Sequence, residues 1–117
     1  MNVKITEDKK RKGFFRVEPH GDIDSDSYAE FRKKITPLFK SSCKAVLLDL
    51  KNVDYISSSG LGVIFSIKKF LVENDGDLVI CNLKPQIVRL FEIVHALPKQ
   101  SIFGTSEDAE RHLNKIK

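Results

Sequence analysis

Three consecutive serines, Ser57, Ser58 and Ser59, are the residues of this sequence whose type and spacing could do chemistry. They lie between a strand-like apolar run and a helical apolar run, so they fall where a strand ends and a helix begins. The first N–H groups of a helix have no partner within it, and a nearby hydroxyl can accept their hydrogen bonds. Gly60 and Gly62 leave room for another molecule to approach the backbone. The stretch therefore predicts a site.

A serine at such a junction could be the nucleophile of a hydrolase. The nucleophile elbow reads G-x-S-x-G and needs a base. Here the first glycine is missing, and of the three histidines only His20 falls at a strand end that could lie near the serines. The phosphate-binding pattern G-x-x-x-x-G-K-[ST] is also missing, and no residues have metal-ligand spacing. We therefore expect no enzyme, no metal and no cofactor.

Two aspartates, Asp22 and Asp24, lie at another predicted strand end. Their simplest role is to form a turn and to cap the helix that follows. If the two strand ends are neighbours, these carboxylates also lie near the serines and could position a hydroxyl or a metal there.

The simplest interpretation of the serines themselves is structural: Ser57 caps the helix, and its neighbours are small because space is short. Three serines nevertheless exceed what one cap requires. A phosphoryl group on a first-turn serine would lie near free N–H groups and the positive end of the helix dipole. It would add about −1.5 to −2 charges at pH 7. A modification that spares the fold but changes the surface is suited to a switch.

The composition is that of a folded domain. The 117 residues suffice for one domain with its own core, and 41% hydrophobic with 31% charged residues argue against disorder. No apolar run reaches the roughly 18–20 residues of a membrane span, and the first residues contain no apolar signal segment. We expect a cytoplasmic protein without a membrane partner.

The charge of +4 is scattered, apart from the basic run at residues 9–12. That run precedes Gly13, where a hairpin turn is expected, so we interpret it as a solvated turn. No aromatic-rich basic motif accompanies it, and we expect no nucleic-acid partner. Cys43 and Cys81 have neither a disulfide framework nor metal-ligand spacing. One is expected at a strand start and the other in a buried strand.

The apolar patterns predict strands at residues 2–6, 14–20, 45–50, 78–81 and 102–103, and helices from about residues 24–26, 57, 85 and 106. Pro37 should kink the first helix or end it near Thr36. The order β-β-α-β-α-β-α-β-α, with short connections, predicts an α/β fold: a mostly parallel sheet with an N-terminal antiparallel edge strand, covered by about four helices.

The helix after the serines carries more apolar residues than one core stripe needs. Leu61 and Phe65 fall to one side of that stripe. They either extend the core or lie at a partner surface beside the serines.

Residues 54–62, D-Y-I-S-S-S-G-L-G, resemble the D-S-S-G-L-G signature of STAS domains, and specifically of bacterial anti-sigma factor antagonists. Residues 21–24, G-D-I-D, resemble the G-E-L-D segment of that family. Residues 82–85, N-L-K-P, and residues 106–109, S-E-D-A, match as well. The resemblance runs nearly end to end, so a single STAS domain is expected over residues 1–117.

The resemblance implies a cytoplasmic switch without catalytic activity, working as a monomer or weak oligomer. A partner that is both serine kinase and anti-sigma factor phosphorylates one serine from ATP. The unphosphorylated antagonist binds this partner and frees the sigma factor, and a phosphatase resets the switch. The alternative is a constitutive STAS scaffold or regulatory subunit of a sensory or transport complex, which is not phosphorylated.

The acceptor serine of the family falls on Ser58. The usual aspartate before it is replaced by Ser57, which becomes the runner-up acceptor. We expect the partner to contact the residues around the acceptor: Asp22, Asp24, Ser57, Ser59, Gly60, Leu61, Gly62 and Phe65.

Overall fold

The computed structural model describes residues 1–39, 43–94 and 102–115. Its elements follow the predicted order. They are β1 (Asn2–Glu7), β2 (Phe14–His20), α1 (Tyr28–Phe39), β3 (Ala45–Asp49), α2 (Ser58–Glu73), β4 (Asp77–Cys81), α3 (Pro85–Val94), β5 (Ile102–Phe103) and α4 (Ser106–Lys115).

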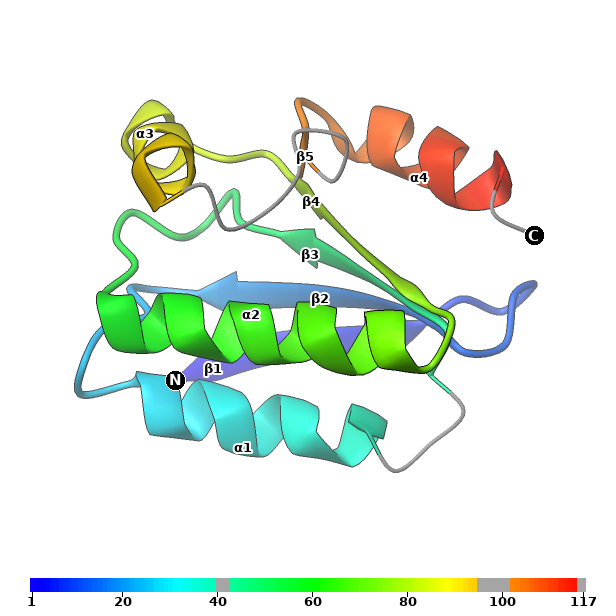
Figure 1. Ribbon diagram of the computed structural model, residues 1–117, viewed down its shortest axis with the longest axis horizontal. Coiled ribbons are helices and arrows are strands. Elements are labelled where there is room, and N and C mark those ends of the chain that lie inside the picture. Colours follow the sequence, from blue (N-terminus) through cyan, green and yellow to red (C-terminus); the bar gives the residue numbers. More distant parts are fainter. Residues whose placement is uncertain (40–42, 95–101, 116–117) are drawn as a thin grey trace.

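The five strands form one sheet in the order β1-β2-β3-β4-β5. β1 and β2 form an antiparallel hairpin, and β2 to β5 are parallel. The predicted α/β fold is therefore confirmed. Because each parallel strand is added on the same side of the previous one, crossovers of a single hand place their helices on one face. α1 and α2 lie side by side on that face, whereas α4, which follows the last strand, covers the other (Figure 1).

The sheet separates two apolar clusters. The larger cluster lies under α1, α2 and α3, and the smaller one lies under α4. β3 contributes to both, because successive side chains of a strand point to opposite faces: Val46 and Leu48 enter the larger cluster, and Ala45 and Leu47 enter the smaller. All five residues of β3 are buried, which explains its continuous apolar run.

The sequence predicted that Pro37 would either kink α1 or end it near Thr36. The helix does not end there but continues through Pro37 to Phe39. Leu38 is buried in the larger cluster, and the Phe39 ring stacks on Phe70 of α2 with the ring centroids 4.5 Å apart. Proline removes a single hydrogen bond at this position. The packing of Leu38 and Phe39 offsets that loss, so the helix continues for two residues beyond Pro37.

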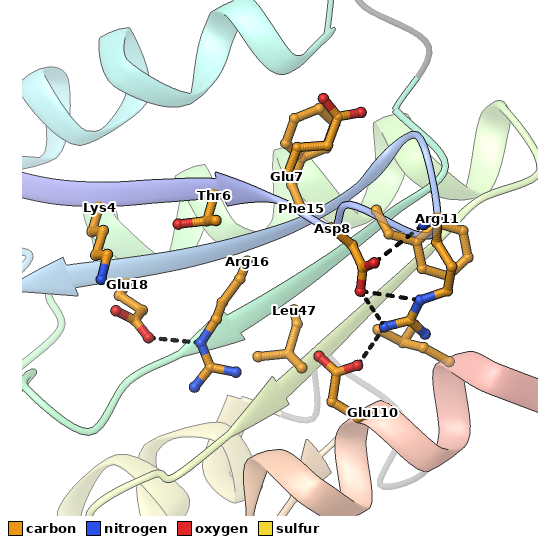
Figure 2. Close-up of a pocket in the computed structure, with 12 residues that line it drawn as sticks. Lys4, Thr6, Glu7, Asp8, Arg11, Phe15, Arg16, Glu18, Leu47 and Glu110 are labelled. Atoms are coloured by element: carbon orange, nitrogen blue, oxygen red, sulfur yellow. Dashed lines mark hydrogen bonds and ion pairs between the residues drawn. The ribbon is translucent and has the colours of Figure 1, made fainter.

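The basic turn is only partly solvated. Lys9, Lys10 and Lys12 are exposed as expected, but Arg11 is 9% exposed. Its guanidinium pairs with Asp8 and with Glu110 of α4, as Figure 2 shows. The expectation was wrong for Arg11 because one of its two carboxylate partners, Glu110, lies 99 residues away in sequence.

A buried carboxylate joins three strands on the α4 side of the sheet. Asp49, at the end of β3, is 1% exposed. It accepts hydrogen bonds from Arg16 Nη2 of β2 at 2.5 Å, from Asn82 Nδ2 after β4 at 3.1 Å, and from the Lys51 backbone N–H at 3.1 Å. A buried charge is tolerated when it is paired and hydrogen-bonded in this way.

Both cysteines are buried, Cys43 just before β3 and Cys81 in β4, as predicted. Burial raises the pKa of the Cys43 thiol to about 11 and that of Cys81 to about 12. Neither is a reactive thiolate at neutral pH. Within the described ranges, no helix has both the length and the apolar character needed to cross a membrane.

We expect Asp49→Ala to lower the free energy of unfolding by about 3 kcal/mol, because it leaves the Arg16 guanidinium without its buried partner. Urea unfolding followed by circular dichroism measures the change. The control is Asp26→Ala, which removes an exposed carboxylate and should change the value by less than about 0.5 kcal/mol. Equal losses in the two variants would contradict the role given to Asp49.

Candidate functional site

The predicted site lies where the chain leaves β2 and β3. Because these strands are parallel neighbours, their carboxyl ends meet at one edge of the sheet. The loop after β2 runs beside the loop after β3: Gly21 N–H donates to Asn52 O at 3.0 Å, Ile23 N–H to Tyr55 O at 3.0 Å, and Ser57 N–H to Ile23 O at 2.8 Å. This pairing places Asp22 and Asp24 on the segment next to the serines.

Ser57 is the N-cap of α2. Its backbone is extended, with φ −79° and ψ 171°, and its hydroxyl oxygen accepts a hydrogen bond from Gly60 N–H at 3.1 Å. This is the capping role that the sequence predicted. The cap orients the first turn of α2, and so it determines where the next two serines lie.

Ser58 is the first residue of α2 and is exposed, whereas Ser59 is half-buried. Neither side-chain hydroxyl makes a hydrogen bond within the part of the chain that the structure describes. Ser58 therefore presents an accessible hydroxyl at the N-terminus of a 16-residue helix. Among the described residues, no side chain that could act as a base forms a hydrogen bond with this hydroxyl.

The two glycines have different surroundings. A Cβ on Gly60 would lie 2.6 Å from the backbone oxygen of Ile23, whereas a Cβ on Gly62 would have no atom within 4 Å. Gly60 therefore allows α2 to approach the loop after β2, an internal contact and not the approach of a partner that we expected. Gly62 is exposed and leaves the surface beside Ser58 open.

Leu61 and Phe65, the two apolar residues of α2 that were expected beside the core stripe, differ in burial. Leu61 is 4% exposed and belongs to the larger apolar cluster. Its expected place at a partner surface is wrong, because the helix turns its side chain toward the sheet. Phe65 is half-buried and packs against the same cluster, so only part of its ring is accessible.

The side chains of Asp22 and Asp24 differ in exposure and in hydrogen bonding. Asp24 Oδ1 accepts hydrogen bonds from the N–H groups of Asp26 at 2.9 Å and Ser27 at 3.0 Å, and its backbone oxygen accepts from Tyr28 N–H. The hydrogen bonds that the carboxylate accepts, first that of Asp26 N–H and then those of Ser27, lower the pKa of the Asp24 carboxyl. Asp24 therefore stabilises the turn that leads into α1. The Asp22 side chain is exposed beside it.

Sequence reasoning missed a contact from α3 to this edge. Lys84 Nζ pairs with the Asp54 carboxylate, and Gln86 Nε2 donates to Asp54 O at 3.2 Å. The adjoining Tyr55 is 54% exposed. The loop carrying these residues has no periodicity, so the sequence contained no signal for which side chains point outward.

A hollow of about 340 Å³ lies elsewhere, on the α4 side of the β1–β2 hairpin (Figure 2). None of the three serines lines it. Its two arginines already pair with carboxylates: Arg11 with Asp8 and Glu110, and Arg16 with Glu18 and Asp49. The hollow is therefore separate from the candidate site.

The two glycines provide a matched pair of substitutions. Gly60→Ala forces a methyl group against the Ile23 backbone and should lower the free energy of unfolding by about 1–3 kcal/mol. Gly62→Ala should raise it by about 0.5–1 kcal/mol, because alanine is the better helix former and space is free. Urea unfolding compares the two, and a Gly60→Ala protein as stable as the native one would contradict the described contact.

Comparison with known proteins identifies relatives of this chain. An anti-sigma-B factor antagonist of Staphylococcus aureus (strain NCTC 8325 / PS 47) is 32% identical over 93 residues, which cover 80% of this chain and 83% of that protein. The protein BtrV of Bordetella bronchiseptica is 33% identical over 108 residues, which cover 92% of this chain and 90% of its own.

Among solved structures, the anti-sigma factor antagonist SpoIIAA in its unphosphorylated form shares the fold with a TM-score of 0.74 at 16% identity, covering 97% of this chain and 98% of that one. The phosphorylated form of SpoIIAA, from Bacillus, has a TM-score of 0.72 at 14% identity, covering 97% of this chain and 100% of that one. The STAS domain family matches residues 6–109. This chain belongs to the STAS domain family.

Proposed function

We propose that this protein is an anti-sigma factor antagonist that works as a phosphorylation-regulated switch in the cytoplasm, with one STAS domain over residues 1–117. The observation that carries the proposal is the exposed, unbonded hydroxyl of Ser58 in the first turn of α2. The names of the relatives, which are anti-sigma factor antagonists, support it.

In the proposed unphosphorylated state, the edge around Ser58 binds a protein that is both serine kinase and anti-sigma factor, and the sigma factor is released. Among the residues predicted to contact the partner, Asp22, Ser58 and Gly62 are exposed, and Phe65 is partly so. Gly60 and Leu61 support this edge from inside. A rigid, preformed surface of this kind loses little conformational entropy on binding.

Ser58 is the better acceptor of the two candidates for a geometric reason. The Ser57 hydroxyl oxygen accepts the Gly60 N–H hydrogen bond, and its residue is half-buried. Transfer of phosphate to Ser57 would disturb that cap. Ser58 is exposed and its hydroxyl is free of such a bond, so a kinase can reach it without changing α2.

Phosphate on Ser58 would prevent docking without unfolding the domain. At a helix N-terminus the added charge of about −1.5 to −2 is favoured by the dipole. On a surface that a partner must cover, the same charge has to be desolvated, and a kinase site that holds the phosphates of ATP would repel it. A phosphatase would then restore the binding form.

The acceptor can be identified with single-serine variants. We expect the cognate kinase and ATP to place one phosphate on the native protein and on Ser57→Ala, and none on Ser58→Ala. Mass spectrometry of proteolytic peptides locates the group. Phosphate on Ser57 alone would contradict the acceptor assignment. A chain that no such kinase phosphorylates, but that still binds a protein partner, would favour the constitutive scaffold.

A charge on Ser58 should abolish binding while the fold remains. For Ser58→Asp we expect a native circular dichroism spectrum and a partner Kd at least about 100-fold weaker, since burying an unpaired carboxylate costs about 3 kcal/mol or more. Ser106→Asp is the control, because Ser106 is also the first residue of a helix but lies on α4, on the other face of the sheet. A melted spectrum for Ser58→Asp, or equal loss in both variants, would contradict the mechanism.

A further inference from the structure

We propose that Tyr55 is the aromatic anchor of the docking surface, and that the partner receives its ring in an apolar pocket beside the Ser58 contact. The inference rests on the proposed function, because it names a binding residue for the same partner. Tyr55 is 54% exposed and lies three positions before Ser58. Tyrosine is among the residue types that most often dominate the binding energy of protein interfaces.

The Tyr55 ring belongs to neither of the two apolar clusters of the described residues. Its neighbours in sequence do contribute to a cluster: Val53 and Ile56 are buried in the larger one, whereas Tyr55 points out between them. The Tyr55 hydroxyl makes no hydrogen bond within the described ranges. An exposed aromatic side chain that joins no apolar cluster of the described residues is available to a partner.

The backbone beneath the ring is held from two sides. Tyr55 O accepts the Ile23 N–H bond at 3.0 Å, and Ser57 N–H donates to Ile23 O at 2.8 Å. From the other side, Lys84 pairs with Asp54, and Gln86 donates to Asp54 O at 3.2 Å. A ring with two side-chain torsions on such a fixed base is preorganised, so ordering it in a complex costs little entropy.

Exposure by itself would not make this argument, since single exposed apolar residues are ordinary. Val72, near the C-terminal end of α2, is 55% exposed. It lies 14 residues beyond Ser58 on the same helix, about 21 Å along its axis. Val72 is therefore a matched control, an equally exposed apolar side chain outside the proposed surface.

The binding experiment uses the unphosphorylated full chain and its purified cognate serine kinase–anti-sigma factor, with Kd measured by calorimetry. We expect Tyr55→Ala to weaken binding about 30-fold, and Tyr55→Phe, which keeps the ring, by less than about threefold. Val72→Ala should bind within twofold of the native chain. Unchanged Tm values for all three variants would show that the losses do not come from unfolding.

A second measurement reports burial of the ring directly. The chain contains no tryptophan, so Tyr55→Trp and Val72→Trp each introduce a single probe. We expect the Tyr55→Trp emission to shift to shorter wavelength and to be protected from acrylamide quenching when the kinase binds, after the kinase signal is subtracted. The Val72→Trp emission should not change.

Tyr55→Ala binding within twofold of the native chain, or a Tyr55→Trp probe that stays exposed in the complex, would overturn the inference. If Ser58→Asp still lost binding in the same assay, the proposed function would stand and only the role of Tyr55 would fall. A native chain that bound no such kinase would overturn both.

Discussion

The backbone of Ile23 is held between Tyr55 O and Ser57 N–H, and the placement of the site depends on this pairing. It extends the parallel register of β2 and β3 beyond the strands themselves, through the Ile23–Ile56 bridge. Gly60 completes the contact, because only a residue without a side chain allows α2 to pack on Ile23 O. The first turn of α2 is thus anchored to the sheet edge, with the Ser58 side chain outward.

The two faces of the sheet are stabilised differently. The α1–α2 face buries a large apolar cluster, whose burial is the main source of folding free energy. The other face is only partly covered by α4 (Figure 1). On this face, paired charges lie beside the smaller apolar cluster, with Arg11 between Asp8 and Glu110 and Arg16 beside Asp49. α2 packs on the apolar face, so the larger apolar cluster holds the helix that begins with Ser58 in place.

The elements of the fold were predictable because apolar periodicity and turn residues are local signals. The five buried residues of β3 and the helix start at Ser57 follow from the sequence directly. Two features did not. α1 passes Pro37 because Phe39 stacks on Phe70, and Arg11 is buried because Glu110 pairs with it. Both depend on a partner distant in the chain, which no local pattern contains.

The sequence by itself determined that Ser57 caps a helix and that Ser58 begins it, since capping depends on residues within one turn. It also placed Asp22 and Asp24 at a strand end. Only the tertiary structure decided which neighbours face inward. Gly60 and Leu61 are internal, and Tyr55 is exposed. The reason is that Gly60 is covered by the loop after β2 and Leu61 by the larger apolar cluster. Both are distant in sequence and meet these residues only when the chain folds.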